Sequence, residues 1–286
     1  MTPDDIFKTI EKQAADGLDF MAVHSALNFD VLKTLQRTGR VTEVVSRGGS
    51  FMTAWMLHNQ KENPLYEQFD RLLAIMKEYD VVLSVGDAVR PGCTADSLDP
   101  VQLMGLMVAG ELTKRALEAG VQVMVEGPGH VPLNHIESTM LLQKRLCYNV
   151  PYYILGFLAT DIATGYDHIT GAIGGAYAGL CGADFLCYLT PAEHLGLPTE
   201  EDVRAGVIAA RIAAQAANLS RRSKSAWDRN MEMAKARVAL DINKQIELSL
   251  YPDKLMAEKE KAHDEHCAVC GKTCASQIAA EYFGIA

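Results

Sequence analysis

Three cysteines lie close together near the end of the sequence, at Cys267, Cys270 and Cys274 in the segment HCAVCGKTC (266–274). A structural zinc site takes four protein ligands, so His263, His266 or a distant residue would have to complete this one. A [4Fe–4S] cluster on three cysteines instead leaves one iron open, which is typical of clusters that bind S-adenosylmethionine and cleave it to a 5′-deoxyadenosyl radical. The spacing alone leaves both kinds of site open.

Polar or glycine-rich segments also follow several short apolar runs. They are HS (24–25), SRGG (46–49), GDAVR (86–90) and EGPGH (126–130). Groups contributed by the ends of many strands are typical of a (β/α) barrel. An open dinucleotide-binding sheet would instead place a single G-x-G-x-x-G turn after its first strand, and this sequence has none there. The pattern therefore favours a barrel.

The elements that would position these groups alternate along the chain. Helices are predicted over 64–79 and 100–119, each opened by a proline, and over about 200–218, opened by the capping pair Thr199 and Asp202. Strands alternating with helices predict an α/β fold with a parallel sheet. The predicted buried strands are 20–24, 42–46, 81–86, 121–126, 152–157 and 184–189.

Only five or six strand units can be recognised, whereas a closed barrel needs eight. The sequence thus predicts an α/β fold of the (β/α)8 TIM type that is incomplete in this chain, with its early strands missing. Residues 223–250 predict one long charged helix, and a polar linker leads from Tyr251-Pro252 to the cysteines. We expect three parts, which are a partial barrel that carries the catalytic site (1–220), a helical tail (221–260) and a cluster-binding arm (261–286).

The composition is that of a globular protein with a large core. Of the 286 residues, 49% are hydrophobic and 22% are charged, and the formal net charge is −9. A negative charge argues against nucleic-acid binding, and no apolar run is long enough to span a membrane. Cys93, Cys147, Cys181 and Cys187 lie among apolar neighbours, and the N-terminus lacks a signal peptide, so we expect buried thiols and a cytoplasmic location.

Longer motifs carry a resemblance to a known family. They are VSRGGSFM (45–52), GDAVRPG (86–92), VMVEGPGHVPL (123–133), TDIATGYDHIT (160–170), LCYLTPAEHLGLP (186–198) and CAVCGKTC (267–274). Over its whole length the chain resembles the phosphomethylpyrimidine synthase (ThiC) family. The resemblance implies a (β/α)8 barrel with a C-terminal cysteine motif. It also implies a radical S-adenosylmethionine lyase that converts 5-aminoimidazole ribotide to 4-amino-5-hydroxymethyl-2-methylpyrimidine phosphate in thiamine biosynthesis.

The resemblance also assigns site residues through the family motifs that they match. Cys267, Cys270 and Cys274 would hold the [4Fe–4S] cluster, and His130 and His194 would bind Zn2+ or another divalent metal. A guanidinium such as that of Arg47 suits a phosphate or a sugar. A homodimer and an external electron donor such as flavodoxin or ferredoxin are implied as well. The substrate would be contacted by His24, Ser46, Arg47, Gly48, Asp87, Ala88, Val89, Arg90, Glu126 and Tyr153.

Thiamine synthesis is the first expectation, in a chain that would be a truncated copy, and three alternatives stay open. Departures from the family pattern at Ser25-Ala26, Ala88, Phe157 and Thr164 raise 5-hydroxybenzimidazole synthase, a similar enzyme of cobamide biosynthesis that uses the same ribotide and the same radical. A truncated chain could also be an inactive remnant or a structural zinc-binding module. Finally, the two histidines with Glu126 as base could form a metal-dependent hydrolase that needs no S-adenosylmethionine.

Overall fold

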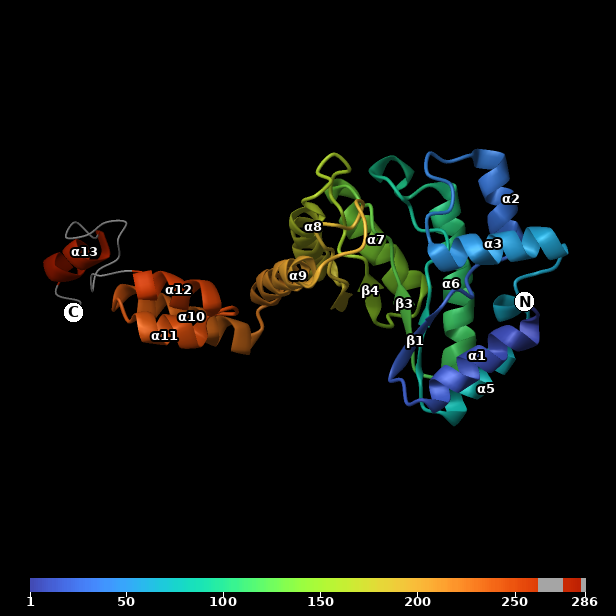
Figure 1. Ribbon diagram of the computed structural model, residues 1–286, viewed down its shortest axis with the longest axis horizontal. Coiled ribbons are helices and arrows are strands. Elements are labelled where there is room, and N and C mark those ends of the chain that lie inside the picture. The colour runs from blue at the N-terminus through green and yellow to red at the C-terminus, as the bar shows by residue number, and fades with distance from the viewer. Residues whose placement is uncertain (262–274, 284–286) are drawn as a thin grey trace. The chain divides into compact units, whose positions relative to one another are not determined.

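The computed structural model describes residues 1–261 and 275–283, and the chain divides into two compact units, Met1–Ala217 and Asn218–Ala286 (Figure 1). The strands, all in the first unit, are β1 (Phe20–Val23), β2 (Val82–Val85), β3 (Val123–Glu126), β4 (Tyr152–Ile154) and β5 (Phe185–Leu186). The helices that begin in the first unit are α1 (Pro3–Ala15), α2 (Phe29–Thr38), α3 (Arg47–Asn59), α4 (Pro64–Glu67), α5 (Phe69–Glu78), α6 (Pro100–Glu118), α7 (Leu133–Leu146), α8 (Asp167–Cys181) and α9 (Glu200–Ser220), with a 3-10 turn at Thr94–Asp96.

The five strands form one parallel sheet in the order β1-β2-β3-β4-β5, so that each strand pairs with the next one along the chain. In register, Ala22 lies opposite Ser84, and Ser84 lies opposite Met124. Further along the sheet, Glu126 lies opposite Tyr153, which lies opposite Phe185. All five carboxyl ends therefore open onto the same edge, as the sequence predicts for an α/β protein.

The sheet is strongly curled. Five strands side by side in a flat sheet would place the two outer strands about 19 Å apart. Yet the rings of Phe20 on β1 and Phe185 on β5 stand edge to face with centroids 6.1 Å apart. Both side chains remain about 45% exposed on the concave face. This curl is consistent with a TIM-type fold.

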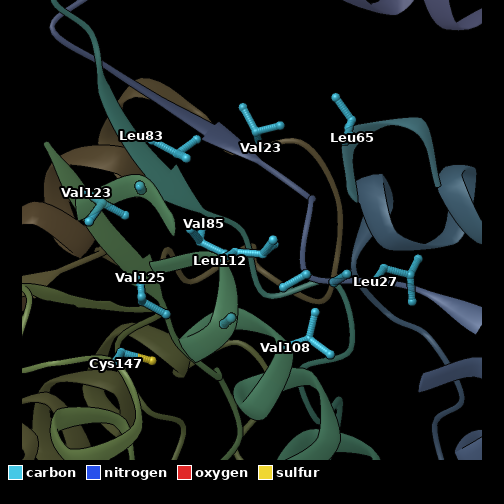
Figure 2. Packing of buried hydrophobic residues seen from close by; sticks show 14 of the residues in the cluster. Val23, Leu27, Leu65, Leu83, Val85, Val108, Leu112, Val123, Val125 and Cys147 are labelled. Carbon is cyan, nitrogen blue, oxygen red and sulfur yellow. The ribbon is translucent and has the colours of Figure 1, made fainter. Parts of the chain in front are cut away.

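The opposite, convex face of the sheet carries the hydrophobic core. Along β1 exposed and buried residues alternate, so that Met21 and Val23 point into the core. In Figure 2, Val85 and Val125 of the sheet lie with Leu112 of α6 in one buried cluster. Burial of each such side chain stabilises the fold by about 1.5–3 kcal/mol. The core thus fixes which face of the sheet the helices cover, and it leaves the concave face open.

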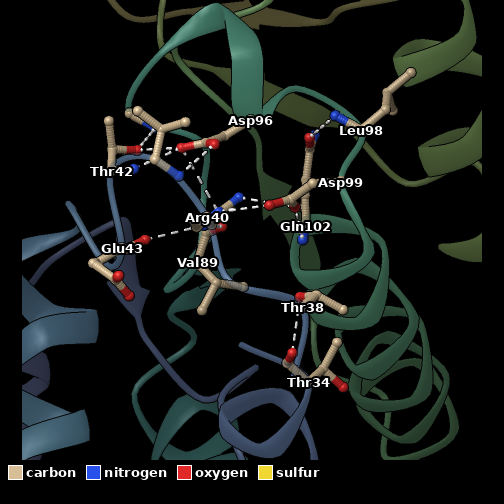
Figure 3. A network of polar contacts seen from close by, with 12 residues as sticks. Thr34, Thr38, Arg40, Thr42, Glu43, Val89, Asp96, Leu98, Asp99 and Gln102 are labelled. Atoms are coloured by element: carbon tan, nitrogen blue, oxygen red, sulfur yellow. Dashed lines mark hydrogen bonds and ion pairs between the residues drawn. The ribbon is translucent and has the colours of Figure 1, made fainter. Parts of the chain in front are cut away.

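A buried ion-pair network joins the segment after α2 to the segment after β2 (Figure 3). The fully buried Arg40 guanidinium donates two hydrogen bonds to the Asp99 carboxylate, at 2.7 and 3.0 Å, and a third to the carbonyl oxygen of Val89 at 2.7 Å. Asp96 accepts from the backbone N–H groups of Val41 and Thr42, both at 2.9 Å. Arg40, Asp96 and Asp99, the buried or largely buried charged groups of this network, are therefore each hydrogen-bonded across the two segments.

The same network explains why the predicted strand at 42–46 is wrong. The β-branched residues there look like a buried strand, but the segment is an irregular loop. The backbone N–H of Thr42 bonds to the Asp96 carboxylate rather than to a neighbouring strand, and Ser46 already caps α3. The SRGG motif is consequently the start of a helix and not a loop after a strand.

Two helix predictions also need correction, and two are confirmed. The predicted helix over 64–79 is divided into α4 and α5, because the backbone of Gln68 leaves the helical region. The helix predicted over 223–250 is interrupted, because Leu240 has a left-handed φ of 53° and Asp241 caps a new helix by accepting from the Lys244 N–H. The helices predicted from residues 100 and 200 are present as α6 and α9.

The second unit contains the other described helices, which are α10 (Lys224–Val238), α11 (Ile242–Leu248), α12 (Asp253–Lys261) and α13 (Ala275–Phe283). Arg229 joins α10 to the end of α11 by donating to the carbonyl oxygens of Leu248 and Ser249, at 2.9 and 3.0 Å. The polar linker predicted after Tyr251-Pro252 is wrong over 253–261, where the backbone is helical. Nowhere in the described ranges does a helix combine the length and the apolar character that a membrane span requires.

Replacing the buried cation tests the network directly. Arg40→Met should lower the free energy of unfolding of the first unit by about 3–5 kcal/mol, because Asp99 loses its partner while it stays largely buried. Lys33→Met is the control: Lys33 and Asp30 form an exposed pair, and its loss should cost about 1 kcal/mol or less. Urea unfolding followed by Trp55 fluorescence, in a Trp227→Phe background, gives both values. Equal small losses in the two variants would contradict the role given to Arg40.

Candidate active site at the carboxyl ends of the strands

His24 follows β1 directly and lies at the centre of a polar cluster. Its Nε2 is 2.8 Å from the Ser46 hydroxyl oxygen and 4.0 Å from Oε2 of Glu126. Ser46 is the N-cap of α3 and accepts from the Gly49 N–H at 3.2 Å. Gly48 lies against the imidazole, since a Cβ at that position would come within 2.5 Å of Nδ1 of His24. The absence of a side chain at Gly48 thus lets α3 begin beside the histidine.

Glu126, the last residue of β3, joins this cluster to the segment after β2. Its Oε2 accepts from the backbone N–H of Asp87 at 2.9 Å, and its Oε1 lies 3.8 Å from Nη1 of Arg90. Arg90 also donates to the carbonyl oxygen of Asp87 at 3.4 Å. The ends of β1, β2 and β3 therefore meet in one cluster, as the (β/α) pattern predicts.

Burial sets the protonation of the cluster. Burial, together with the nearby Arg90 cation, lowers the pKa of His24 to about 4, so the imidazole is neutral at pH 7. Burial beside the Glu126 carboxylate raises the pKa of Asp87 to about 7. Burial also raises the pKa of Glu126, against the opposing effect of Arg90. The cluster therefore combines a neutral imidazole with two carboxyl groups and the Arg90 cation, which together suit a small ligand with amino, ring-nitrogen and hydroxyl groups.

The three residues from Asp87 to Val89 do not all present side chains to this cluster. The side chain of Asp87 lines a small cavity between the sheet and α6, beside Gln102 and Tyr152. The side chains of Ala88 and Val89 are buried in the core, at 1% and 0% exposure. Only the backbone of these two residues can contact a ligand. At Val89 the carbonyl oxygen is already bound by Arg40.

Arg47 is the first residue of α3 and is exposed. The first turn of that helix contains no acidic residue. The N-terminus of a helix attracts anions because its first N–H groups lack intrahelical partners. Arg47 therefore stands where a cation and a helix N-terminus could act together on a phosphate.

Tyr153 lies on the concave face of β4 and extends the site across the sheet. Its ring is 4.8 Å from that of Phe185, which in turn contacts Phe20. Burial raises the pKa of Tyr153, so its hydroxyl stays protonated. Ser84, on the same face of β2, is fully buried, and its hydroxyl has no hydrogen-bond partner among the described residues. The concave face thus combines aromatic rings with a few hydroxyl groups.

His130 and His194 come together, although they are far apart in the sequence. Their ring centroids are 5.4 Å apart, with the ring planes at 56°. Nδ1 of His130 is 2.8 Å from Oδ1 of Asp161, and Nδ1 of His194 is 2.9 Å from Oδ1 of Asp167. Hydrogen bonds from Thr94 and His130 lower the pKa of Asp161, against the opposing effect of its partial burial. Both imidazoles thus use Nδ1 for a carboxylate.

The spacing of these rings fits a metal ion. A zinc–nitrogen bond of about 2.1 Å puts the metal about 3.2 Å from the centre of a bound imidazole, so two rings at the tetrahedral angle have centres about 5.2 Å apart. The observed 5.4 Å agrees with that value. In the part of the chain that the structure describes, no group of three or more His, Cys, Asp or Glu side chains is arranged around a metal position. The described residues therefore offer a metal ion two imidazoles here and no third ligand.

The family motifs contain further cysteine and histidine side chains. Cys267, Cys270 and Cys274 lie outside the described residues. His168, the last residue of the sequence G-Y-D-H (165–168), lines a different small cavity with Gly156 and Cys187, and its buried Nδ1 has no hydrogen-bond partner among the described residues. The structure gives no contact between His168 and the two other histidines.

A sequence profile of the radical SAM ThiC family matches residues 1–281. The chain belongs to this family. Membership of a radical SAM family implies S-adenosylmethionine and an iron–sulfur cluster. The three relatives that follow match 99–100% of the chain, which spans about two thirds of their own length.

The identities to individual relatives differ. The chain is 67% identical to the 5-hydroxybenzimidazole synthase BzaB of Moorella thermoacetica, over 100% of this chain and 67% of that protein. It is 60% identical to the phosphomethylpyrimidine synthase of Desulfitobacterium hafniense, over 99% of this chain and 66% of the relative. It is 57% identical to the phosphomethylpyrimidine synthase of Moorella thermoacetica, with the same coverage. The chain therefore resembles both kinds of enzyme in this family.

Sequence reasoning missed Asp161, Asp167, Thr94 and Arg40. The two aspartates lie 31 and 27 residues from the histidines that they contact, so no local spacing links them. Their only signal is that both fall within the motif TDIATGYDHIT. Arg40 is 59 residues from Asp99 and belongs to no motif considered above.

The raised pKa of Asp87 predicts a pH-dependent stability. In the unfolded chain an aspartate ionises near pH 3.9, whereas in the folded chain Asp87 does so at about 7. Between these values the unfolded chain has already released the proton, so this carboxyl makes the folded state less stable as the pH rises from 4 to 7. Below pH 4 its contribution is constant.

Asp87→Asn should therefore gain stability relative to the wild type over that pH range. The measurement is the free energy of unfolding in urea, followed by Trp55 fluorescence at several pH values from 4 to 7.5. Parallel curves for the variant and the wild type would contradict the raised pKa.

Proposed function

We propose that this chain carries the catalytic site of a radical S-adenosylmethionine enzyme that converts 5-aminoimidazole ribotide to 5-hydroxybenzimidazole. The observation that carries this choice is the comparison within one organism. Two Moorella thermoacetica relatives are aligned over practically the whole chain, and the benzimidazole enzyme has the higher identity, 67% against 57%. Because both relatives come from the same species, the difference between them reflects their two activities more than species divergence.

The geometry of the cluster supports a ribotide as the ligand. A ribotide has a phosphate at one end and a sugar and an aminoimidazole at the other. Arg47 at the start of α3 suits the phosphate. The neutral His24, with Glu126 and the backbone of Asp87, suits the amino and hydroxyl groups. Tyr153 would border the aromatic ring from the concave face.

The chain's own residues would bind and orient the substrate, while the cofactors supply the chemistry. Cys267, Cys270 and Cys274 would hold the [4Fe–4S] cluster, which transfers one electron to S-adenosylmethionine and so starts radical chemistry. Flavodoxin or ferredoxin would supply that electron. His130 and His194 would bind Zn2+ or another divalent metal, whose remaining positions are open to a ligand.

The same proposal covers the assembly. The curled sheet would belong to a (β/α)8 barrel, with 1–220 as the catalytic part, 221–260 as a helical tail and 261–286 as the cluster-binding arm. A homodimer in the cytoplasm is part of the proposal. Further strands next to β1 or β5 would give these edges the pairing partners that parallel sheets require.

Thiamine synthesis, the first expectation from the sequence, is supported at the level of the family. The 60% identity to a phosphomethylpyrimidine synthase favours it as the second candidate. Since both reactions begin from the same ribotide and radical, the residues around His24 and Glu126 would serve either product.

The product decides between the two candidates. The full chain, reconstituted without oxygen with iron and sulfide, is incubated with S-adenosylmethionine, dithionite and 5-aminoimidazole ribotide, and the products are separated by mass. We expect 5-hydroxybenzimidazole. Formation of the hydroxymethylpyrimidine phosphate would replace the proposal by the thiamine reaction, and turnover without S-adenosylmethionine would favour a hydrolase. Absence of any product would support the inactive remnant and contradict the proposal for this chain.

The three cysteines can be tested without turnover. Cys267→Ala, Cys270→Ala and Cys274→Ala should each abolish the brown absorption near 400 nm that an iron–sulfur cluster gives, because each removes one of three thiolates. Cys181→Ala is the matched control, since Cys181 is a half-buried thiol outside the motif, and it should keep the absorption. Retention of the cluster in any of the three variants would contradict the assignment. A colourless wild-type chain with tightly bound zinc would indicate the structural zinc module instead.

A further inference from the structure

The carboxylates that contact the two histidines are bound in the same way. In each, Oδ1 faces an imidazole Nδ1, at 2.8 Å for Asp161 and 2.9 Å for Asp167. In each, Oδ2 accepts from a backbone N–H, that of Thr94 at 2.9 Å and that of Gly165 at 3.2 Å. Because a backbone N–H fixes Oδ2 of the carboxylate, Oδ1 of the same carboxylate can hold the imidazole in one orientation. Both carboxylates lie in the segment TDIATGYDHIT (160–170), and each makes the same pair of contacts.

This arrangement determines which ring nitrogen carries the proton. A carboxylate accepts, so each Nδ1 must donate, and the lone pair of the neutral ring is then on Nε2. Among the residues that the structure describes, neither Nε2 has a hydrogen-bond partner. Metal-binding histidines characteristically donate their other ring N–H to a carboxylate, which fixes the tautomer and raises the basicity of the ligand.

We propose that Asp161 and Asp167 are positioning residues that prepare His130 and His194 for a metal ion. The inference rests on the proposed metal site and adds residues that act through its ligands. Asp161 does more than orient one ring. It also accepts from the Thr94 hydroxyl at 2.6 Å, and Thr94 follows the segment that carries Asp87 and Arg90. The metal ligand His130 is thereby tied to the loop of the polar cluster.

Burial strengthens the case for Asp167. Its side chain is 6% exposed, and among the described residues His194 is its only ion-pair partner, with the Gly165 N–H as a second hydrogen-bond partner. An isolated buried carboxylate is unfavourable unless positive charge lies nearby. The N-terminus of α8 supplies part of it, because Asp167 is the first residue of that helix. A cation on His194 would supply the rest.

A purely structural role has to be distinguished, since an acid in the first turn stabilises any helix. Asp202 provides the matched control. It lies in the first turn of α9 and accepts from the Thr199 N–H at 2.9 Å, much as Asp167 accepts from Gly165, but no imidazole of the described residues is hydrogen-bonded to it. Asp202→Asn therefore removes the same charge from the same kind of position.

The test measures zinc affinity of the full chain by competition with a chelator, in a background with Cys267, Cys270 and Cys274 changed to alanine so that their thiolates do not bind zinc. Asp161→Asn and Asp167→Asn should each weaken binding by about 10–100-fold, as is usual for partners of metal-binding histidines. Asp202→Asn should leave the affinity unchanged, and His194→Ala should abolish this binding. Thermal unfolding shows that the variants fold.

A second readout needs no metal. Long-range 1H–15N NMR spectra of the apo chain report which nitrogen of each histidine is protonated. We expect Nδ1–H in the wild type at both His130 and His194, and an increase of Nε2–H at the affected histidine in each aspartate variant. Wild-type affinity and an unchanged tautomer in Asp161→Asn and Asp167→Asn would overturn the inference while leaving the metal site standing. Absence of zinc binding in the triple-alanine background with both aspartates intact would overturn the metal site itself.

Discussion

Parallel pairing of five short strands is the constraint on which the rest of the structure depends. A parallel sheet sends every carboxyl end to the same edge, so residues that are distant in sequence become neighbours without any special contact between them. His24, Asp87 and Glu126 follow or end β1, β2 and β3, and the shared strand direction brings them to one edge. The strands themselves are only two to four residues long. For bringing these residues together, the shared direction of the strands matters more than their length.

Side-chain contacts between loops then turn a shared edge into a defined site. Arg40 binds Asp99 and the carbonyl oxygen of Val89, and this fixes the segment after β2 against the segment that leads into α3. Without that cation, two carboxylates would be left in the interior. Further along the same segment, Thr94 binds Asp161, which holds His130. The polar cluster and the paired histidines are therefore connected through the loop that follows β2, although they occupy different strand ends.

The sequence was a good guide where a signal is local. Five of the six apolar runs contain strands, and prolines and capping pairs marked the starts of α6 and α9, because each depends on neighbouring residues. The sixth run, 42–46, failed since its backbone bonds to Asp96, about 55 residues away. The breaks at Gln68 and Leu240 were missed because neither carries glycine or proline.

For the site, motifs located the histidines and acids, but their pairing with Asp161 and Asp167 depends on how the loops meet. The paired residues are 31 and 27 positions apart, and such separations correspond to no helix or strand periodicity. The pairing is therefore visible only in the folded structure. The sequence also does not indicate which side chains of the segment after β2 are buried. It separates Ala88 and Val89, whose side chains face the core, from their neighbour Arg90, which faces the cluster.

The order of the strands has a consequence for synthesis on the ribosome. Because each strand pairs with the one that follows it in the chain, β1 and β2 can join as soon as residue 85 has emerged, and each later strand can add to an edge that already exists. Strand addition in the order of translation lets each new strand pair with the edge that the preceding strand has just formed. The ring contact between Phe20 of the first strand and Phe185 of the fifth must wait for the last of these strands. The curl is thus completed late, after every pairing in the sheet has been made.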